Sequence, residues 1–180
     1  MKQKKISNNF TAYELIFAGE TVNKLELDNI PKNEQTWNGL AQLSQNLLEP
    51  LTLKFGKPLI TYCFASHALT RNIKKNICPA LDQHAGSELQ KNNKFICSRL
   101  GQAVDLYYPD IDSRELSAWI VENINFDRMY YYGPDRPIHV SVGPQNSKSL
   151  IFMQPQPTGR RIPRKISMDW LKKINSTNSN

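Results

Sequence analysis

The stretch that decides the fold is Gly101-Gln102-Ala103-Val104-Asp105-Leu106-Tyr107, taken together with Pro137-Ile138-His139-Val140-Ser141-Val142 further along the chain. The second stretch alternates polar and apolar side chains, which is typical of a strand with one buried face, and the first also reads as a strand. Gly101 and Ala103 are small, so backbone can crowd around the acid that follows them. Asp105 and His139 are therefore candidate site residues, although an aspartate in a strand can also serve as an ion-pair partner and a histidine can be purely structural.

Outward from these strands, helix signals dominate the first half of the chain and strand signals the second. Helices are expected after the capping box that begins at Thr11, from 33 to about 49, after a Ser66 cap, after Asp112 and near 168–174. Further strands are expected at 59–64, 127–132 and 149–154, and 127–132 forms a hairpin with 137–142. This order favours an α+β fold, with a small antiparallel sheet packed against helices.

The 180 residues are enough for one domain with a core, which we place at 10–158, between a flexible N-terminus at 1–9 and a basic C-terminal tail at 159–180. No apolar run is long enough to cross a bilayer, and none follows the basic first residues as a secretion signal would. We therefore expect a cytoplasmic protein without membrane contact. The three cysteines form no CxxC pair, which indicates reduced thiols.

The net charge of +7 is unevenly spread, since the run 159–173 carries six basic residues and one aspartate. Such a run could bind nucleic acid or another acidic partner, for example an anionic wall polymer. A solubilising surface is the other interpretation.

Several motifs, in order, suggest a family. They read NFTAYEL, DNIP, NLLEPL and FGKPLITYCF in the first half, and LGQAVDL, NFDRMYYYG and PIHVSVG in the second. From about Phe10 to Gly143, the chain resembles the zinc D-Ala-D-Ala carboxypeptidase and Hedgehog-like superfamily, also called the DD-peptidase superfamily. The resemblance implies a fold of that type, one zinc ion and a peptide or peptidoglycan-like substrate.

The resemblance also implies a set of metal ligands. Asp105 and His139 match two ligand positions directly. The usual position of the first histidine is Ser98 here, but Asp82-Gln83-His84 resembles the Ser-Gln-His that carries this ligand. His84 is then the third ligand, separated from Gly101 by an insertion at 85–99.

Two helper residues of the family are replaced. Ala65 stands where an arginine holds the substrate carboxylate, and Arg71 or Arg99 could take over that role. Tyr132 stands where a glutamate acts as general base in the family, and Asp135 or Glu88 could substitute for that glutamate. The alternative is that Asp135 is only a turn residue and Glu88 only a solvated acid.

Two functions follow from these patterns. The first is a zinc-dependent hydrolase related to the peptidoglycan D-Ala peptidases and diverged in substrate. The alternative is a catalytically altered or inactive protein of the same fold that binds an intracellular ligand, such as nucleic acid or a protein partner.

Overall fold

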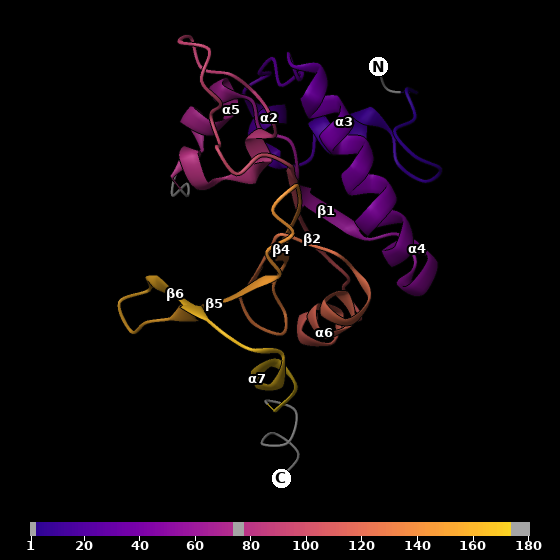
Figure 1. Cartoon of the computed structure of the whole chain (residues 1–180), viewed down its shortest axis with the longest axis vertical. Helices are drawn as coiled ribbons and strands as arrows, with labels where there is room; N and C mark the ends of the chain where they lie inside the picture. Colours follow the sequence, from indigo (N-terminus) through magenta and orange to yellow (C-terminus); the bar gives the residue numbers. More distant parts are fainter. Residues whose placement is uncertain (1–2, 74–77, 174–180) are drawn as a thin grey trace.

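A computed structural model describes residues 3–73 and 78–173. The chain forms a mixed α+β structure around one six-stranded sheet (Figure 1). The helices are α1 (Ala12–Ile16), α2 (Glu20–Lys24), α3 (Glu34–Leu43), α4 (Glu49–Phe55), α5 (His67–Asn72), α6 (Ser113–Asn123) and α7 (Met168–Lys173), with a π-type turn η1 (Ser44–Leu48) and the short 3-10 turns η2 (Pro79–Leu81) and η3 (Gln83–Ala85). The strands are β1 (Leu59–Tyr62), β2 (Gln102–Tyr107), β3 (Arg128–Tyr131), β4 (Ile138–Val142), β5 (Ser149–Pro155) and β6 (Arg161–Lys165).

The sheet has the strand order β1-β2-β4-β3-β5-β6. All neighbouring strands are antiparallel except β3 and β5, which run parallel. The predicted antiparallel sheet is therefore correct for four of the five pairings and wrong for one. The parallel pair arises because the chain leaves β4 and returns past Phe126 to the far side of β3, where Lys148 donates its backbone N–H to the Phe126 carbonyl.

Alternation along the central strands divides the sheet into two faces. One face is apolar and belongs to the main core, with Val104 and Leu106 from β2, Met129 and Tyr131 from β3, and Ile138 and Val140 from β4. The opposite face carries Asp105, Tyr130 and His139, and the register pairs Asp105 and Tyr130 each with His139. The polar residues thus share one face because the register keeps them together.

Most of the helices follow from local sequence signals. The capping box at Thr11 is present, and the Glu14 carboxylate accepts a hydrogen bond from the Thr11 backbone N–H at 2.8 Å. Asn33, Ser66 and Asp112 cap α3, α5 and α6 with their side chains. The helix predicted to end near Glu49 instead continues through Pro50, because this proline lies in the first turn of α4, where no backbone N–H donor is needed.

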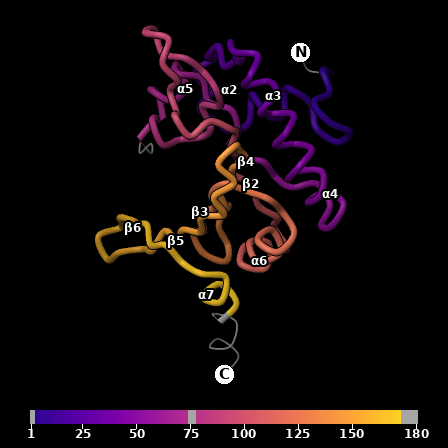
Figure 2. The backbone as a smooth tube through the Cα atoms, viewed as in Figure 1, coloured from indigo at the N-terminus to yellow at the C-terminus, as the bar shows by residue number. Residues whose placement is uncertain are grey.

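The C-terminal part of the chain belongs to the fold. Residues 161–165, predicted within a basic tail, form β6 on the edge of the sheet, and Leu171 of α7 is buried in the main core. The boundary predicted at 158 therefore falls inside a hairpin and separates no folded part from a tail. Figure 2 shows the β5–β6 hairpin projecting away from the body of the molecule.

The N-terminal residues from Lys5 to Asn9 are also tied to the body. Lys5 forms a β-bridge with Thr11, and Ser7 and Asn9 donate hydrogen bonds to the Glu49 carboxylate. No helix in the described part of the chain is both long and apolar enough to span a membrane.

One backbone crossing locks β2 against the end of β4. Gly101 has φ +76°, and a Cβ placed on it would lie 2.2 Å from the Val142 carbonyl oxygen. Gly101 is therefore required twice, by its left-handed conformation and by the close approach of two backbones. This crossing sets where β2 begins and so fixes the position of Asp105.

Candidate metal centre

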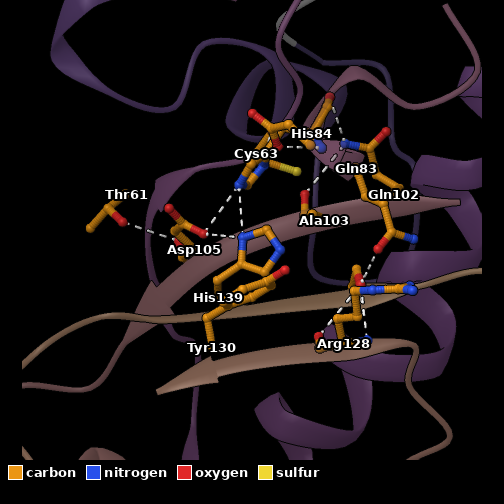
Figure 3. A network of polar contacts seen from close by, with 12 residues as sticks. Thr61, Cys63, Gln83, His84, Gln102, Ala103, Asp105, Arg128, Tyr130 and His139 are labelled. Atoms are coloured by element: carbon orange, nitrogen blue, oxygen red, sulfur yellow. Dashed lines mark hydrogen bonds and ion pairs between the residues drawn. The ribbon is translucent and has the colours of Figure 1, made fainter. Parts of the chain in front are cut away.

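Three side chains converge on the polar face of the sheet (Figure 3). His139 Nδ1 lies 2.9 Å from Asp105 Oδ1, and His84 Nε2 lies 3.1 Å from the same oxygen. The two imidazole nitrogens are themselves 3.1 Å apart. Asp105 and His139 come from neighbouring strands, whereas His84 comes from η3, which lies far from β2 in the sequence. The structure thus brings together the three residues predicted as metal ligands.

The backbone carbonyl of Cys63 sets the tautomer of His84. Its Nδ1 lies 2.5 Å from the Cys63 carbonyl oxygen, which can only accept, so Nδ1 carries a proton. In the neutral ring Nε2 then presents its lone pair toward Asp105 and His139. A backbone carbonyl behind a ligating histidine is the usual arrangement that orients such a ring.

The loop that carries His84 is fastened to the sheet by Gln83. Its side-chain amide donates to Asp127 at 3.0 Å and to the Leu100 carbonyl at 2.8 Å, and its oxygen accepts from Ser141 at 2.8 Å. All of the Gln83 side chain's partners lie on or next to the strands, and Asp127 is fully buried. A buried and satisfied polar network of this kind places His84 accurately against β2 and β4.

Charge in the cluster is strongly coupled. Burial lowers the pKa of His84, but the Asp105 and Asp82 carboxylates outweigh it and raise that pKa to about 9. Burial raises the pKa of Asp105, but the two imidazoles hold it well below its ordinary range. Without an ion, the cluster therefore keeps a proton shared between an imidazole and the carboxylate near neutral pH.

The donor set suits a small divalent cation. Zinc with ligands at about 2.0–2.1 Å holds tetrahedral donor atoms about 3.3 Å apart. The separations of 2.9–3.1 Å found here are only slightly shorter. Two imidazole nitrogens and one carboxylate oxygen also match the composition of hydrolytic zinc sites, which leave a further position open. Within the described residues, His84, Asp105 and His139 form the group able to hold a metal ion.

The cluster opens into a cavity of about 330 Å³. Its wall includes segments distant in sequence, among them Thr61 and Tyr62 at the end of β1, Val22 of α2, Leu69 of α5 and Tyr132 just after β3. The Tyr62 ring lies 4.4 Å from the His84 ring, centroid to centroid, and its hydroxyl is buried without a hydrogen-bond partner. A buried hydroxyl without a partner indicates a place for a ligand or water.

Neither of the predicted base residues lines this cavity. The Glu88 carboxylate is nearly buried and accepts from the backbone N–H groups of Lys32 and Asn33 and from the Thr36 hydroxyl. Asp135 lies in the exposed turn between β3 and β4, beside a separate hollow. The prediction that one of them acts as the base is therefore not supported by the cavity lining. The contacts of loop residues cannot be predicted from their spacing along the sequence.

Asp82 is the residue that the sequence interpretation overlooked. It is 5% exposed, lines the cavity, and accepts the His84 backbone N–H at 3.1 Å as the cap of η3. The signal was available, because Asp82 stands two residues before His84 in the motif that identified this ligand.

The two predicted carboxylate-binding arginines do not line the cavity either. Arg99 donates to the Leu81 carbonyl at 2.9 Å and lies 3.4 Å from the Tyr130 hydroxyl, whose ring packs edge-on against His139. Arg71 is exposed near the end of α5. Ala65, where the resemblance places an arginine, is fully buried and donates its backbone N–H to the His84 carbonyl.

Comparison of the chain with protein-family models, with curated proteins and with solved structures finds no match in any of the three. The chemistry of the site therefore carries the functional proposal.

Proposed function

We propose that this protein is a zinc-dependent hydrolase, related to the D-Ala peptidases of peptidoglycan and diverged in substrate, with a Hedgehog/DD-peptidase type of fold. The observation that carries the proposal is the convergence of His84 Nε2, Asp105 Oδ1 and His139 Nδ1 within 3.1 Å of one another. These atoms face a cavity large enough for a segment of peptide.

In this proposal His84, Asp105 and His139 hold one zinc ion. When bound, zinc would polarise a substrate carbonyl and lower the pKa of a coordinated water. The Cys63 carbonyl keeps His84 in the ligating tautomer, and the Gln83 network keeps it in place. Asp82 is the nearly buried carboxylate on the cavity wall that would accept a hydrogen bond from an attacking water, in place of Asp135 and Glu88, which do not line the cavity.

Metal analysis of the purified protein tests this function. We expect one zinc per chain in the wild type and loss of most of it in His139→Ala. His67→Ala is the matched control, because His67 is exposed at the start of α5 and makes no contact with the cluster. Absence of metal from the wild type under every loading condition would overturn the proposal, as would equal loss in both variants.

A second candidate function is binding of nucleic acid through the β5–β6 hairpin, and one observation favours it. The β5–β6 hairpin projects from the body (Figure 2). Its residues Arg160, Arg164 and Lys165 are exposed, and none of them forms an ion pair with a residue that the structure describes. A two-stranded ribbon of this kind can enter the major groove of a duplex, with its cations on the phosphates.

Point variants test this candidate better than truncation, because deleting 159–180 would remove β6 and the buried Leu171. We expect anisotropy of labelled duplex DNA to report binding whose affinity falls steeply with salt, with a shallower slope in Arg160→Ala/Arg164→Ala/Lys165→Ala. Lys24→Ala/Lys32→Ala removes exposed lysines from another region and is the control. Binding insensitive to both salt and the hairpin variant would rule this candidate out.

A further inference from the structure

The wall of the metal-site cavity is acidic and neutral. Besides the two histidines, its ionisable side chains are Glu20, Asp82, Asp105 and two tyrosines. No lysine or arginine occurs among the described residues that line it. Glu20 is paired with Lys24 outside the cavity, while the nearly buried Asp82 has no ion-pair partner within the described chain.

This wall lacks the group that usually binds a carboxylate. Recognition of a free C-terminal carboxylate calls for a paired cation, most effectively a bidentate arginine. Of the two predicted arginines, Arg99 donates to the Leu81 carbonyl and the Tyr130 hydroxyl, and neither Arg99 nor Arg71 lines the cavity. A carboxylate placed away from the metal ligands would find no cation among the described wall residues, and the unpaired Asp82 would repel it.

The cavity does offer a neutral hydrogen-bond donor. Tyr132 lies on the wall with His139 and Asp105, and its hydroxyl makes no hydrogen bond with any described residue. A tyrosine phenol keeps its proton at neutral pH, so the Tyr132 hydroxyl can donate a hydrogen bond into the cavity.

Tyr132 is also held rigidly from its other side. Arg161 of β6 donates to the Tyr132 carbonyl at 2.8 Å and to the Met153 carbonyl at 2.8 Å. The same guanidinium lies 5.7 Å from the centre of the Tyr132 ring. The strand on the edge of the sheet thus fixes both the backbone and the ring of a residue in the cavity, and a donor fixed in advance is the kind that stabilises developing charge.

We infer that the cavity accepts an internal, uncharged peptide amide in preference to a C-terminal carboxylate, and that the Tyr132 hydroxyl donates a hydrogen bond to the oxygen of its carbonyl group. The inference rests on the proposed function, because it places the carbonyl next to the metal ligands. The proton stays on the phenol throughout, and Tyr132 strengthens its bond as negative charge grows on the oxygen. The protein would then act as an endopeptidase or amidase.

Binding of two phosphinate pseudodipeptides to the zinc-loaded protein tests this inference. The two probes carry the same D-alanyl side chains and differ only at the C-terminus, which is a carboxamide in one and a carboxylate in the other. Calorimetry should show at least about tenfold tighter binding of the carboxamide. Tyr132→Phe should weaken the carboxamide probe about 10- to 100-fold, since it loses one hydrogen bond to a charged oxygen.

Tyr130→Phe is the matched control, because Tyr130 lies in β3, two residues before Tyr132, but its hydroxyl pairs with Arg99 outside the cavity. The affinity of Tyr130→Phe for the carboxamide probe should stay within about twofold of the wild type. In Tyr132→Phe, the affinity for the corresponding planar dipeptide amide should fall far less than the affinity for the phosphinate. With zinc content at one per chain, three results would overturn the inference: tighter binding of the carboxylate probe, an unchanged affinity of Tyr132→Phe for the carboxamide probe, or binding of neither probe. Absence of zinc would overturn the proposed function as well.

Discussion

Asp105 lies directly opposite His139 in the β2–β4 ladder, and the two side chains meet at 2.9 Å on the polar face of the sheet. Two of the three candidate ligands are therefore placed by strand register alone. The third, His84, depends on the loop that Gln83 fastens to the same strands.

Gln83→Ala should loosen the third ligand. The substitution leaves the fully buried Asp127 without its side-chain donor and Ser141 with only its longer bond to the Arg128 carbonyl, which costs about 1–3 kcal/mol in the free energy of unfolding. Zinc affinity should fall about 10- to 100-fold, as for other residues that orient a ligand. Chelator competition and chemical denaturation measure the two effects. Gln90→Ala, on the exposed arm of the same loop, should change neither, and an equal effect there would contradict the assignment.

Glu88→Ala should destabilise the protein without removing zinc. It leaves the Lys32 and Asn33 N–H groups and the Thr36 hydroxyl without their acceptor, at a cost of about 2–4 kcal/mol. Thermal unfolding and metal content of the folded protein check this. Glu115→Ala, on the exposed side of α6, serves as the control. A stable Glu88→Ala protein that lost only hydrolysis would restore Glu88 as the base.

Gly101→Ala and Gly159→Ala separate two reasons for a glycine. Both have φ near +75°, but only at Gly101 would a new Cβ collide with backbone, whereas Gly159 has open space around it. Gly159→Ala should cost about 1 kcal/mol, for conformation alone. Gly101→Ala should cost about 3 kcal/mol or more and broaden the β2 resonances in NMR spectra. Similar costs at both positions would show that the crossing yields easily.

Zinc binding should depend steeply on pH. In the metal-free protein the pKa of His84 is raised from 6.5 to about 9, so an ion must displace a proton below that pH. Apparent affinity should fall about tenfold for each pH unit between 8 and 7. Competition titrations at several pH values measure the slope. A flat profile would mean that His84 is already neutral at pH 7.

The free energy of unfolding of the metal-free protein should fall as pH rises, whereas zinc affinity rises with pH. A pKa raised on folding contributes stability that is complete below about 6.5 and is lost as pH rises through 9. Denaturation at pH 6 and pH 9.5 should differ by up to about 3 kcal/mol, and His84→Ala should abolish most of that difference. An equal pH dependence in the variant would assign it to other groups.

The sequence predicted those parts of the fold that depend on local chemistry. Side-chain caps at Thr11, Asn33, Ser66 and Asp112 begin the helices, and period-two alternation marks β4. β6 was missed because Arg161-Ile162-Pro163-Arg164-Lys165 carries little apolar surface and gains its place only by pairing with β5. Its charge made it resemble a solvated tail.

The site was predictable only as far as register and motif reach. Asp105 and His139 lie on strands, and His84 belongs to a recognisable motif, so their meeting could be anticipated. The positions of the helper residues Glu88, Asp135 and Arg99 could not be anticipated, because they depend on how loops pack. Glu88, for example, accepts a hydrogen bond from Lys32, which is more than 50 residues away in the sequence. The motif places Tyr132 where the family has its base, but the hydrogen bond from Arg161 depends on β6, which the sequence does not predict.

The loop after His84 also makes a small arm. Leu89 pairs with Phe95, Ile96 donates its backbone N–H to the Glu88 carbonyl, and the residues between Glu88 and Ile96 are exposed. None of the three candidate ligands lies on this arm, and its base is anchored by buried groups at both ends. The arm can therefore be lengthened, shortened or exchanged for an epitope while the cluster keeps its geometry, which makes it the natural place for a label and for evolutionary variation.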